Sequence, residues 1–224
     1  MHKQGMHEIF SFLRDIALHN DREWFNAHRD RYEAAYGQFT LIATDMIERI
    51  SRFEPGVIGL PVKSTLYRFY RDTRFSLDKS PYKRHFGTYI NPMGKKSLHG
   101  GYYLHLQPGN SMVAVGSYGL PTPVLRAVRQ SVVNEVERFH AILTEPELAA
   151  LKPLLGESHL KTIPAGFPRD FAYPEYLRPR EYDLSIMLKD DFFMNPDWPE
   201  QTAHLFHLMK PFIDFVNETV DDYI

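Results

Sequence analysis

The stretch from Tyr102 to Val115, YYLHLQPGNSMVAV, decides the fold class of this chain. Its two runs are rich in residues that favour β-strands, and they flank Pro108-Gly109-Asn110, which has the composition of a short turn. The stretch therefore predicts an antiparallel hairpin in the middle of the sequence. On its first strand, Tyr103, His105 and Gln107 alternate along one polar and aromatic face, which we expect to be exposed or to face a ligand.

Outside this hairpin, further strands are predicted close to it and helices at both ends. Aromatic runs between Leu66 and Ile90, and one run at Asp183 to Leu188, are typical of strands. Helical spacing of apolar residues predicts helices over residues 6–19, 22–53 with a bend near Gly37, 122–143, 144–156 and from 198 almost to the terminus. Expected helix caps are Asn20 or Asp21, Thr122 and Thr144.

Helices at both ends and strands in the middle, without regular βαβ alternation, favour an α+β fold. We expect one domain over residues 1–224, in which a mainly antiparallel central sheet is packed by the N-terminal and C-terminal helices.

Composition excludes several function classes. The 224 residues hold 26 Lys and Arg against 28 Asp and Glu, so a net charge of −2 disfavours nucleic acid as a partner. No cysteine is present, which excludes disulfide scaffolds, thiolate catalysis, zinc fingers and iron–sulfur clusters. Without an apolar leader or a long apolar run, we expect a cytoplasmic protein that has no membrane contact.

No cofactor or metal is predicted. The sequence has none of the glycine-rich phosphate-binding or nucleophile motifs of common nucleotide-binding proteins and hydrolases. His204 and His207 are spaced for one helix face, but they lack the HExxH pattern and adjoin an apolar stripe, which indicates surface histidines.

The segment from Arg68 to Arg84, RFYRDTRFSLDKSPYKR, carries the strongest functional signal. Its six basic and two acidic side chains give a local net charge of +4 on a slightly acidic protein. Arginine binds carboxylates and phosphates through its planar fork and stacks on aromatic rings, which are interleaved here. We therefore expect an anionic small molecule as ligand, phosphorylated or carboxylate, with or without catalysis. The residues expected to bind the anion are Arg68, Arg71, Arg74, Lys79 and Lys83, with Asp72 and Asp78 orienting the arginines. If the protein is an enzyme, His105 or Tyr82 is the expected proton carrier.

Two alternatives stay open at this point. The segment is structural if Arg71 pairs with Asp72 and Arg74 with Asp78 to hold a loop on the sheet. It is a non-catalytic interaction module if the same residues meet an acidic protein or a nucleic-acid backbone.

The same segment resembles a family of bacterial and fungal proteins known as domain of unknown function 2461. The resemblance is carried by Arg68, Arg71, Asp72, Arg74, Phe75, Asp78, Lys79, Pro81, Tyr82 and Lys83. It extends to residues 20–25, 101–105, 160–167 and 176–178, and therefore covers most of the chain. The resemblance implies a single α+β domain and no particular activity.

Overall fold

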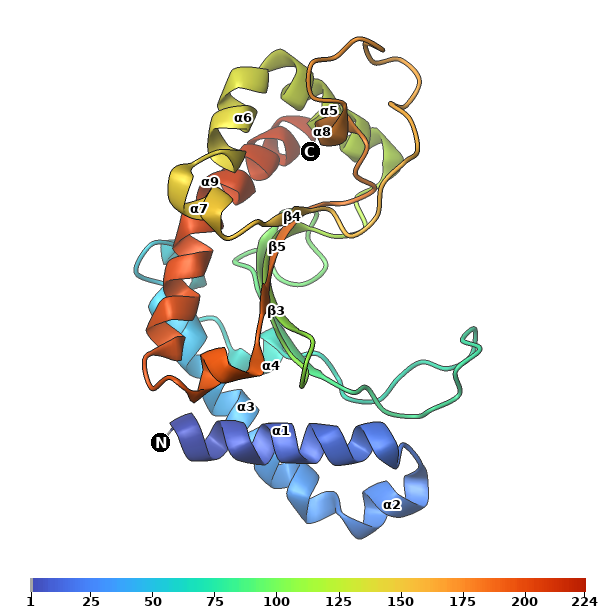
Figure 1. The fold of residues 1–224 in the computed structure, drawn as a ribbon, viewed down its shortest axis with the longest axis vertical. Helices are drawn as coiled ribbons and strands as arrows, with labels where there is room; N and C mark the ends of the chain where they lie inside the picture. Colours follow the sequence, from blue (N-terminus) through green and yellow to red (C-terminus); the bar gives the residue numbers. More distant parts are fainter. Residues whose placement is uncertain (1) are drawn as a thin grey trace. The chain divides into compact units, whose positions relative to one another are not determined.

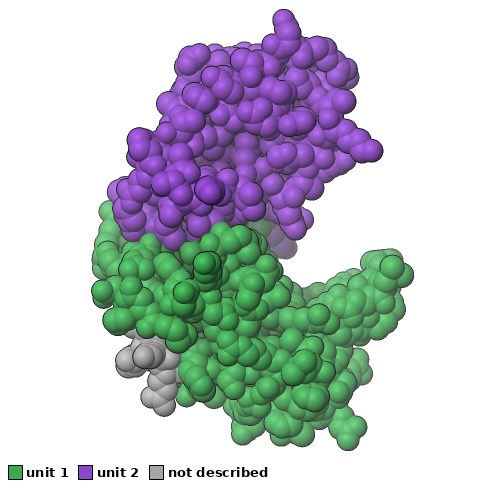
Figure 2. Space-filling model, in the orientation of Figure 1, with its two compact units in different colours: residues 1–95, 103–112, 187–203 green, residues 96–102, 113–186, 204–224 purple. Residues whose placement is uncertain are grey.

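The computed structural model describes residues 2–224 (Figure 1). The chain divides into two compact units, each assembled from three stretches of sequence (Figure 2). Unit 1 holds the described part of Met1–Lys95 with Tyr103–Met112 and Met187–Ala203, and unit 2 holds Lys96–Tyr102, Val113–Ile186 and His204–Ile224. The single domain expected over residues 1–224 stays a prediction, and the two units are described separately below.

Within the described residues, five strands form one sheet in the order β1-β2-β3-β5-β4. Their bounds are β1 Phe86–Ile90, β2 Gly101–Leu106, β3 Ser111–Ser117, β4 Leu154–Leu155 and β5 Tyr182–Leu188. The predicted hairpin is β2 and β3, and its turn is closed by a hydrogen bond from Asn110 N to Gln107 O of 2.9 Å. The sheet is antiparallel, with Leu154 opposite Ser185 at its β4 edge, so the predicted α+β class is confirmed.

The first helices of unit 1 are α1 His2–Leu18, α2 Arg22–Ala27 and α3 Arg29–Ile50. Asp21 caps α2 as predicted, because its side chain accepts a hydrogen bond of 2.8 Å from Trp24 N. The predicted bend near Gly37 is wrong, since α3 runs through Gly37 and the break lies at His28. There the backbone leaves the helical region, the His28 ring stacks on Trp24 at 4.2 Å, and His28 Nδ1 lies 2.8 Å from Trp24 O.

Shorter elements complete unit 1: η1 Pro55–Val57, α4 Val62–Thr65 and η2 Asp190–Met194. Helix α1 packs against α3, and between them and the sheet lies a core of aromatic rings. Phe12 stacks on Phe86 at 6.1 Å and Phe25 on Tyr82 at 4.1 Å between ring centroids. Each buried aromatic ring removes a large apolar area from water, so this cluster is a main source of the unit's stability.

Unit 2 contains α5 Thr122–Asn134, α6 Val136–Leu143, α7 Pro146–Ala150 and α8 Pro174–Leu177, and α9 Trp198–Tyr223 continues into it. The helix predicted over 122–143 is interrupted at Glu135, whose ψ of 40° is not helical. Thr122 lies inside α5 rather than capping it, and Glu145 caps α7 in place of Thr144. The Thr144 hydroxyl instead donates back to His140 O at 2.7 Å, which leaves the Leu148 N–H to the longer Glu145 side chain.

The core of unit 2 is centred on Phe139, which contacts Tyr176, Tyr182, Phe212 and Phe215. Arg129 is only 6% exposed and donates to Leu177 O at 2.9 Å and Pro179 O at 2.7 Å. This buried arginine satisfies carbonyl groups of the coil that follows α8. In the part of the chain that the structure describes, no helix combines the length and apolar character needed to cross a bilayer.

Candidate functional site

The segment from Arg68 to Arg84 forms a narrow loop whose two ends pair with each other. Arg71 N donates to Pro81 O and Lys83 N donates to Phe69 O, both at 2.9 Å, and Tyr70 and Tyr82 face each other in this short ladder. The Asn20 side chain bonds both the N–H and the C=O of Tyr82, each at 3.0 Å. The side chain of Asn20 therefore anchors the base of the loop through the backbone groups of Tyr82.

The tip of this loop, residues 71–80, is held together by Arg71. Its guanidinium donates to Asp78 Oδ2 at 2.6 Å, to Ser80 Oγ at 2.5 Å and to Ser76 Oγ at 3.3 Å. The Ser80 hydroxyl and N–H, followed by Arg71, hold the pKa of Asp78 well below its usual range. Arg71 thus closes the tip on itself.

The ion pairs differ from those that the structural alternative predicted. Arg74 pairs with Asp72 through two hydrogen bonds of 3.0 and 2.7 Å, and Arg71 pairs with Asp78. The reason is geometric: the turn after Asp72 brings the Arg74 fork back onto that carboxylate, while the reversal of the loop carries Asp78 to Arg71. Hydrogen bonding to Arg74, through its side chain first and its backbone second, lowers the pKa of Asp72.

Lys79 and the apolar residues of the tip are open to water. Lys79 Nζ donates to Thr73 O at 3.0 Å, and the side chains of Phe75 and Leu77 are 95% and 102% exposed. The charged groups of the tip are thus already engaged by neighbours within the loop. Of the five residues predicted to bind an anion, Arg71, Arg74 and Lys79 lie in this tip.

Arg68 and Lys83 lie instead at the base of the loop, where they join a lysine that sequence reasoning missed. Lys83 Nζ lies 5.2 Å from the centre of the Tyr67 ring, and Lys95 Nζ lies 5.3 Å from the same ring. Lys95 also donates to Leu66 O at 2.6 Å. We call Arg68, Lys83 and Lys95, together with Tyr67, the cation cluster.

The lysines of the cation cluster are destabilised in their charged form. Burial lowers the pKa of Lys83, and the positive charges of Arg68 and Lys95 lower it further. Burial also lowers the pKa of Lys95. Among the described residues no carboxylate contributes to either shift, although a nearby carboxylate would act in the opposite direction.

The polar face of β2 adjoins this cluster. The Tyr67 ring meets Tyr103 edge-on, with centroids 6.0 Å apart. Tyr103 Oη lies 3.0 Å from His105 Nδ1, and His105 Nε2 lies 3.1 Å from Gln107 Oε1. Both ring nitrogens of His105 are therefore engaged, in a line formed by Tyr103 and His105 on one face of β2 and by Gln107 directly after it.

His85, just before β1, completes the arrangement. Its ring stacks on His105 at 4.1 Å. Burial, then the charges of His105 and Lys83, lower the pKa of His85 to about 3. Its ring makes no hydrogen bond with any residue that the structure describes. It is therefore a neutral imidazole whose nitrogens are available to a ligand.

Tyr82, the second predicted proton carrier, lies in the core. Its side chain is 3% exposed, and its ring stacks on Phe25. Burial is the main cause of its raised pKa. The catalytic roles given to Tyr82 and His105 stay predictions.

Sequence reasoning missed Tyr67, His85 and Lys95, and it placed Tyr103 on the polar face of a strand without placing it beside Tyr67. One sequence feature pointed to a close contact here: Gly87, two residues after His85, is a glycine inside β1, the strand that pairs with β2. A Cβ atom at Gly87 would lie 2.8 Å from Tyr103 Oη, so only glycine lets the Tyr103 hydroxyl lie there.

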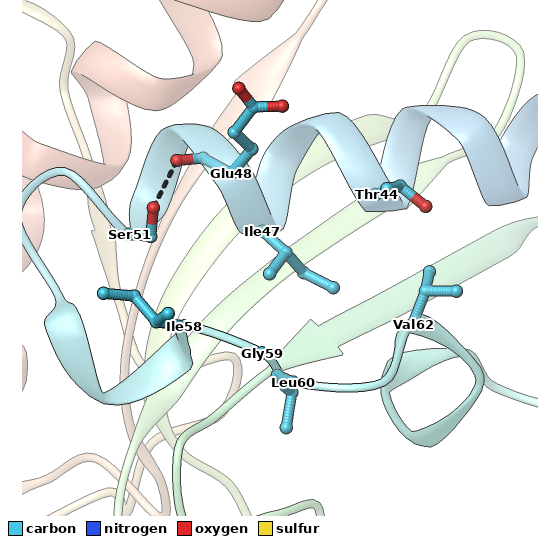
Figure 3. A pocket seen from close by; sticks show the side chains of 8 residues that line it. All are labelled: Thr44, Ile47, Glu48, Ser51, Ile58, Gly59, Leu60 and Val62. Carbon is cyan, nitrogen blue, oxygen red and sulfur yellow. Dashed lines mark hydrogen bonds between the residues drawn. The ribbon is translucent and has the colours of Figure 1, made fainter.

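Two cavities of the described structure lie elsewhere. One, of about 350 Å³, lies between the end of α3 and the chain that leads to α4, with Ile47 and Val62 pointing into it (Figure 3). The other, of about 410 Å³, lies in unit 2 beside β4 and Tyr176. Neither is lined by the cation cluster, and the residues described include no group of three or more His, Asp or Glu side chains that could hold a metal ion.

Comparison with curated proteins and with solved structures finds no match for this chain. A family model described as "Conserved hypothetical protein (DUF2461)" matches residues 8–215. The match begins within α1 and ends within α9, so it includes the loop of residues 68–84, the cation cluster and the polar face of β2. With nearly the whole length matched, the chain belongs to the DUF2461 family of conserved hypothetical proteins.

Proposed function

We propose that this protein binds a small anionic molecule at the cation cluster. The observation that carries the proposal is the position of Lys83, a half-buried ammonium whose neighbouring charges, Arg68 and Lys95, are both positive. Lys83 is partly buried, whereas Arg68 and Lys95 are exposed. A partly buried ammonium that is also repelled by two positive neighbours is stabilised by an opposite charge, which offsets both costs. An anion from solution supplies that charge.

The proposal assigns different roles to the two parts of the loop. Arg68 and Lys83 contact the anion, together with Lys95. Arg71 holds the tip in shape through Asp78, and Asp72 orients the Arg74 fork. The tip residues Arg74 and Lys79, which are engaged by Asp72 and by Thr73 O, do not form the binding contacts. A reaction at this site would use an imidazole of the stacked pair, His85 or His105, as proton carrier.

A specific observation supports an architectural role for the tip. Arg71 makes all of its side-chain hydrogen bonds to groups between Ser76 and Ser80. This network needs no ligand to be satisfied. We therefore place the anion at the base of the loop rather than at the tip.

The test is thermal unfolding of the wild type with a panel of inorganic phosphate, sulfate, dicarboxylates, phosphorylated metabolites and short oligonucleotides. A ligand present at about 100 times its dissociation constant adds about 2.7 kcal/mol to stability. We expect this gain to vanish in Lys83→Met and to persist in Lys79→Met, the matched lysine variant in the tip. Lys83→Met itself should be as stable as the wild type or more so, since it removes a poorly solvated charge.

Two results would count against the proposal. One is the absence of any ligand-dependent gain in the wild type. The other is an equal loss of that gain in both lysine variants, which would indicate attraction by overall charge. A steep fall of affinity with salt, together with binding of oligonucleotides, would favour the interaction module instead, because many phosphate contacts release many counterions.

A further inference from the structure

We propose that the ligand group held by the cation cluster is a dianionic oxyanion of the phosphate type, and that His85 takes up a proton when the group binds. This inference rests on the proposed function and goes beyond it by naming the class of ligand and the accompanying protonation.

The charge of the site favours a dianion over a monoanion. Arg68, Lys83 and Lys95 supply three positive charges. Among the described residues no carboxylate acts on either lysine, whereas Asp72, which pairs with Arg74, also feels the charge of Arg68. A single carboxylate would leave most of that charge uncompensated. A tetrahedral dianion offers several acceptor oxygens, which suits donors that approach from different elements.

The aromatic ring at the centre of the site points to the same class. Both ammonium groups lie against Tyr67, and Tyr103 meets it edge-on. A nucleobase or another aromatic ligand that stacked on this ring would compete with the two ammonium groups for it. Recognition at the cluster therefore depends on charge and hydrogen bonding.

His85 is the group placed to change protonation state. It stacks on His105 at 4.1 Å, and the charged or titratable groups that act on it are His105 from β2 and Lys83 from its own segment. His105 is engaged at both ring nitrogens by Tyr103 and Gln107, whereas His85 has no hydrogen-bond partner among the described residues. A dianion beside Lys83 reverses the local field and favours the imidazolium form of His85, which then donates to the anion.

Sulfate is the probe for the test, because it remains a dianion without titrating near neutral pH. Calorimetric titration at about pH 6, in two buffers with different heats of ionisation, measures the protons taken up per sulfate bound. We expect each sulfate that binds to take up a fraction of a proton, and this fraction should approach one as the pH is lowered toward about 5. Over the same range the affinity for sulfate should increase by at most tenfold for each unit by which the pH falls. Acetate should bind at least about tenfold more weakly than sulfate.

His85→Asn should abolish the proton uptake while sulfate still binds, and the exposed His7→Asn on α1 should leave the uptake unchanged. Equal affinity for acetate and sulfate would overturn the assignment of a dianion and leave the proposed function intact. Proton uptake that persists in His85→Asn would overturn the role of His85. Failure of the wild type to bind any anion would overturn the proposed function itself.

Discussion

Asn20 offers the clearest test of how the loop is anchored. Its amide donates to Tyr82 O and accepts from Tyr82 N, both at 3.0 Å, so one side chain replaces the two hydrogen bonds of a neighbouring strand. Each neutral hydrogen bond contributes about 1 kcal/mol to stability, and a buried backbone group left without a partner costs about 1 to 3 kcal/mol. Because Tyr82 is buried, Asn20→Ala should lower the free energy of unfolding by about 2 to 3 kcal/mol.

Urea unfolding followed by tryptophan fluorescence measures this loss. Both tryptophans, Trp24 and Trp198, belong to unit 1, so the signal reports on the unit that contains Asn20. The matched control is the exposed Asn26→Ala on α2, which should change stability by less than about 0.5 kcal/mol. Asn20→Asp keeps the acceptor for Tyr82 N but places a carboxylate oxygen against Tyr82 O, so it should also be less stable than the wild type.

A loss below about 0.5 kcal/mol for Asn20→Ala would refute this reasoning, because it would show that water replaces the amide without cost. An Asn20→Asp variant as stable as the wild type would show that only the Tyr82 N–H needs a partner. Either result would remove the anchor from the account of the loop base, where Lys83 follows Tyr82.

The remaining predictions concern both units. Burial, followed by the charges of Glu181 and Glu157, raises the pKa of Asp183 to about 6, so the folded state binds a proton more tightly than the unfolded state. The melting temperature should therefore fall as the pH rises from about 4 to about 6, and Asp183→Asn should reduce this dependence on pH. Gly116→Ala places a Cβ atom 2.3 Å from Tyr182 O at a φ of +118°, and this variant should not fold into a soluble protein. Gly37 lies in open space on α3, so Gly37→Ala should add about 0.5 to 1 kcal/mol to the free energy of unfolding and raise the melting temperature. Arg71→Ala should expose residues 71–80 to limited proteolysis with little change in melting temperature, and an undigested loop would contradict the role of Arg71 in closing the tip.

The confirmed parts of the fold are those that depend on neighbours in sequence. The hairpin of β2 and β3 follows from a turn between two alternating runs. The Asp21 cap follows because the Asp21 side chain accepts a hydrogen bond from the backbone N–H of Trp24, three residues later. Wrong details arose where two residues compete for one local role. Glu145 caps α7 in place of Thr144, and the break in the second predicted helix lies at His28 rather than at Gly37, because a glycine in open space can remain helical.

The candidate site divides in the same way. The period of a strand identified which side chains share the face of Tyr103, His105 and Gln107, but not its burial, since His105 is only 7% exposed. The ion pairs of the tip required the path of the loop, which carries Asp78 to Arg71 across seven residues. No local pattern predicts that path.

By itself, the sequence determined the fold class, the central hairpin and a concentration of positive charge over residues 68–84, because strand alternation, turn composition and charge are local properties. The tertiary structure decided which of those charges are engaged and which lie together. Lys95 reaches Tyr67 across 28 residues, and His85 reaches His105 across 20, through the pairing of β1 with β2. Contacts of this kind depend on strand register and burial, which arise only when the chain packs, and they place the proposed anion site at the base of the loop.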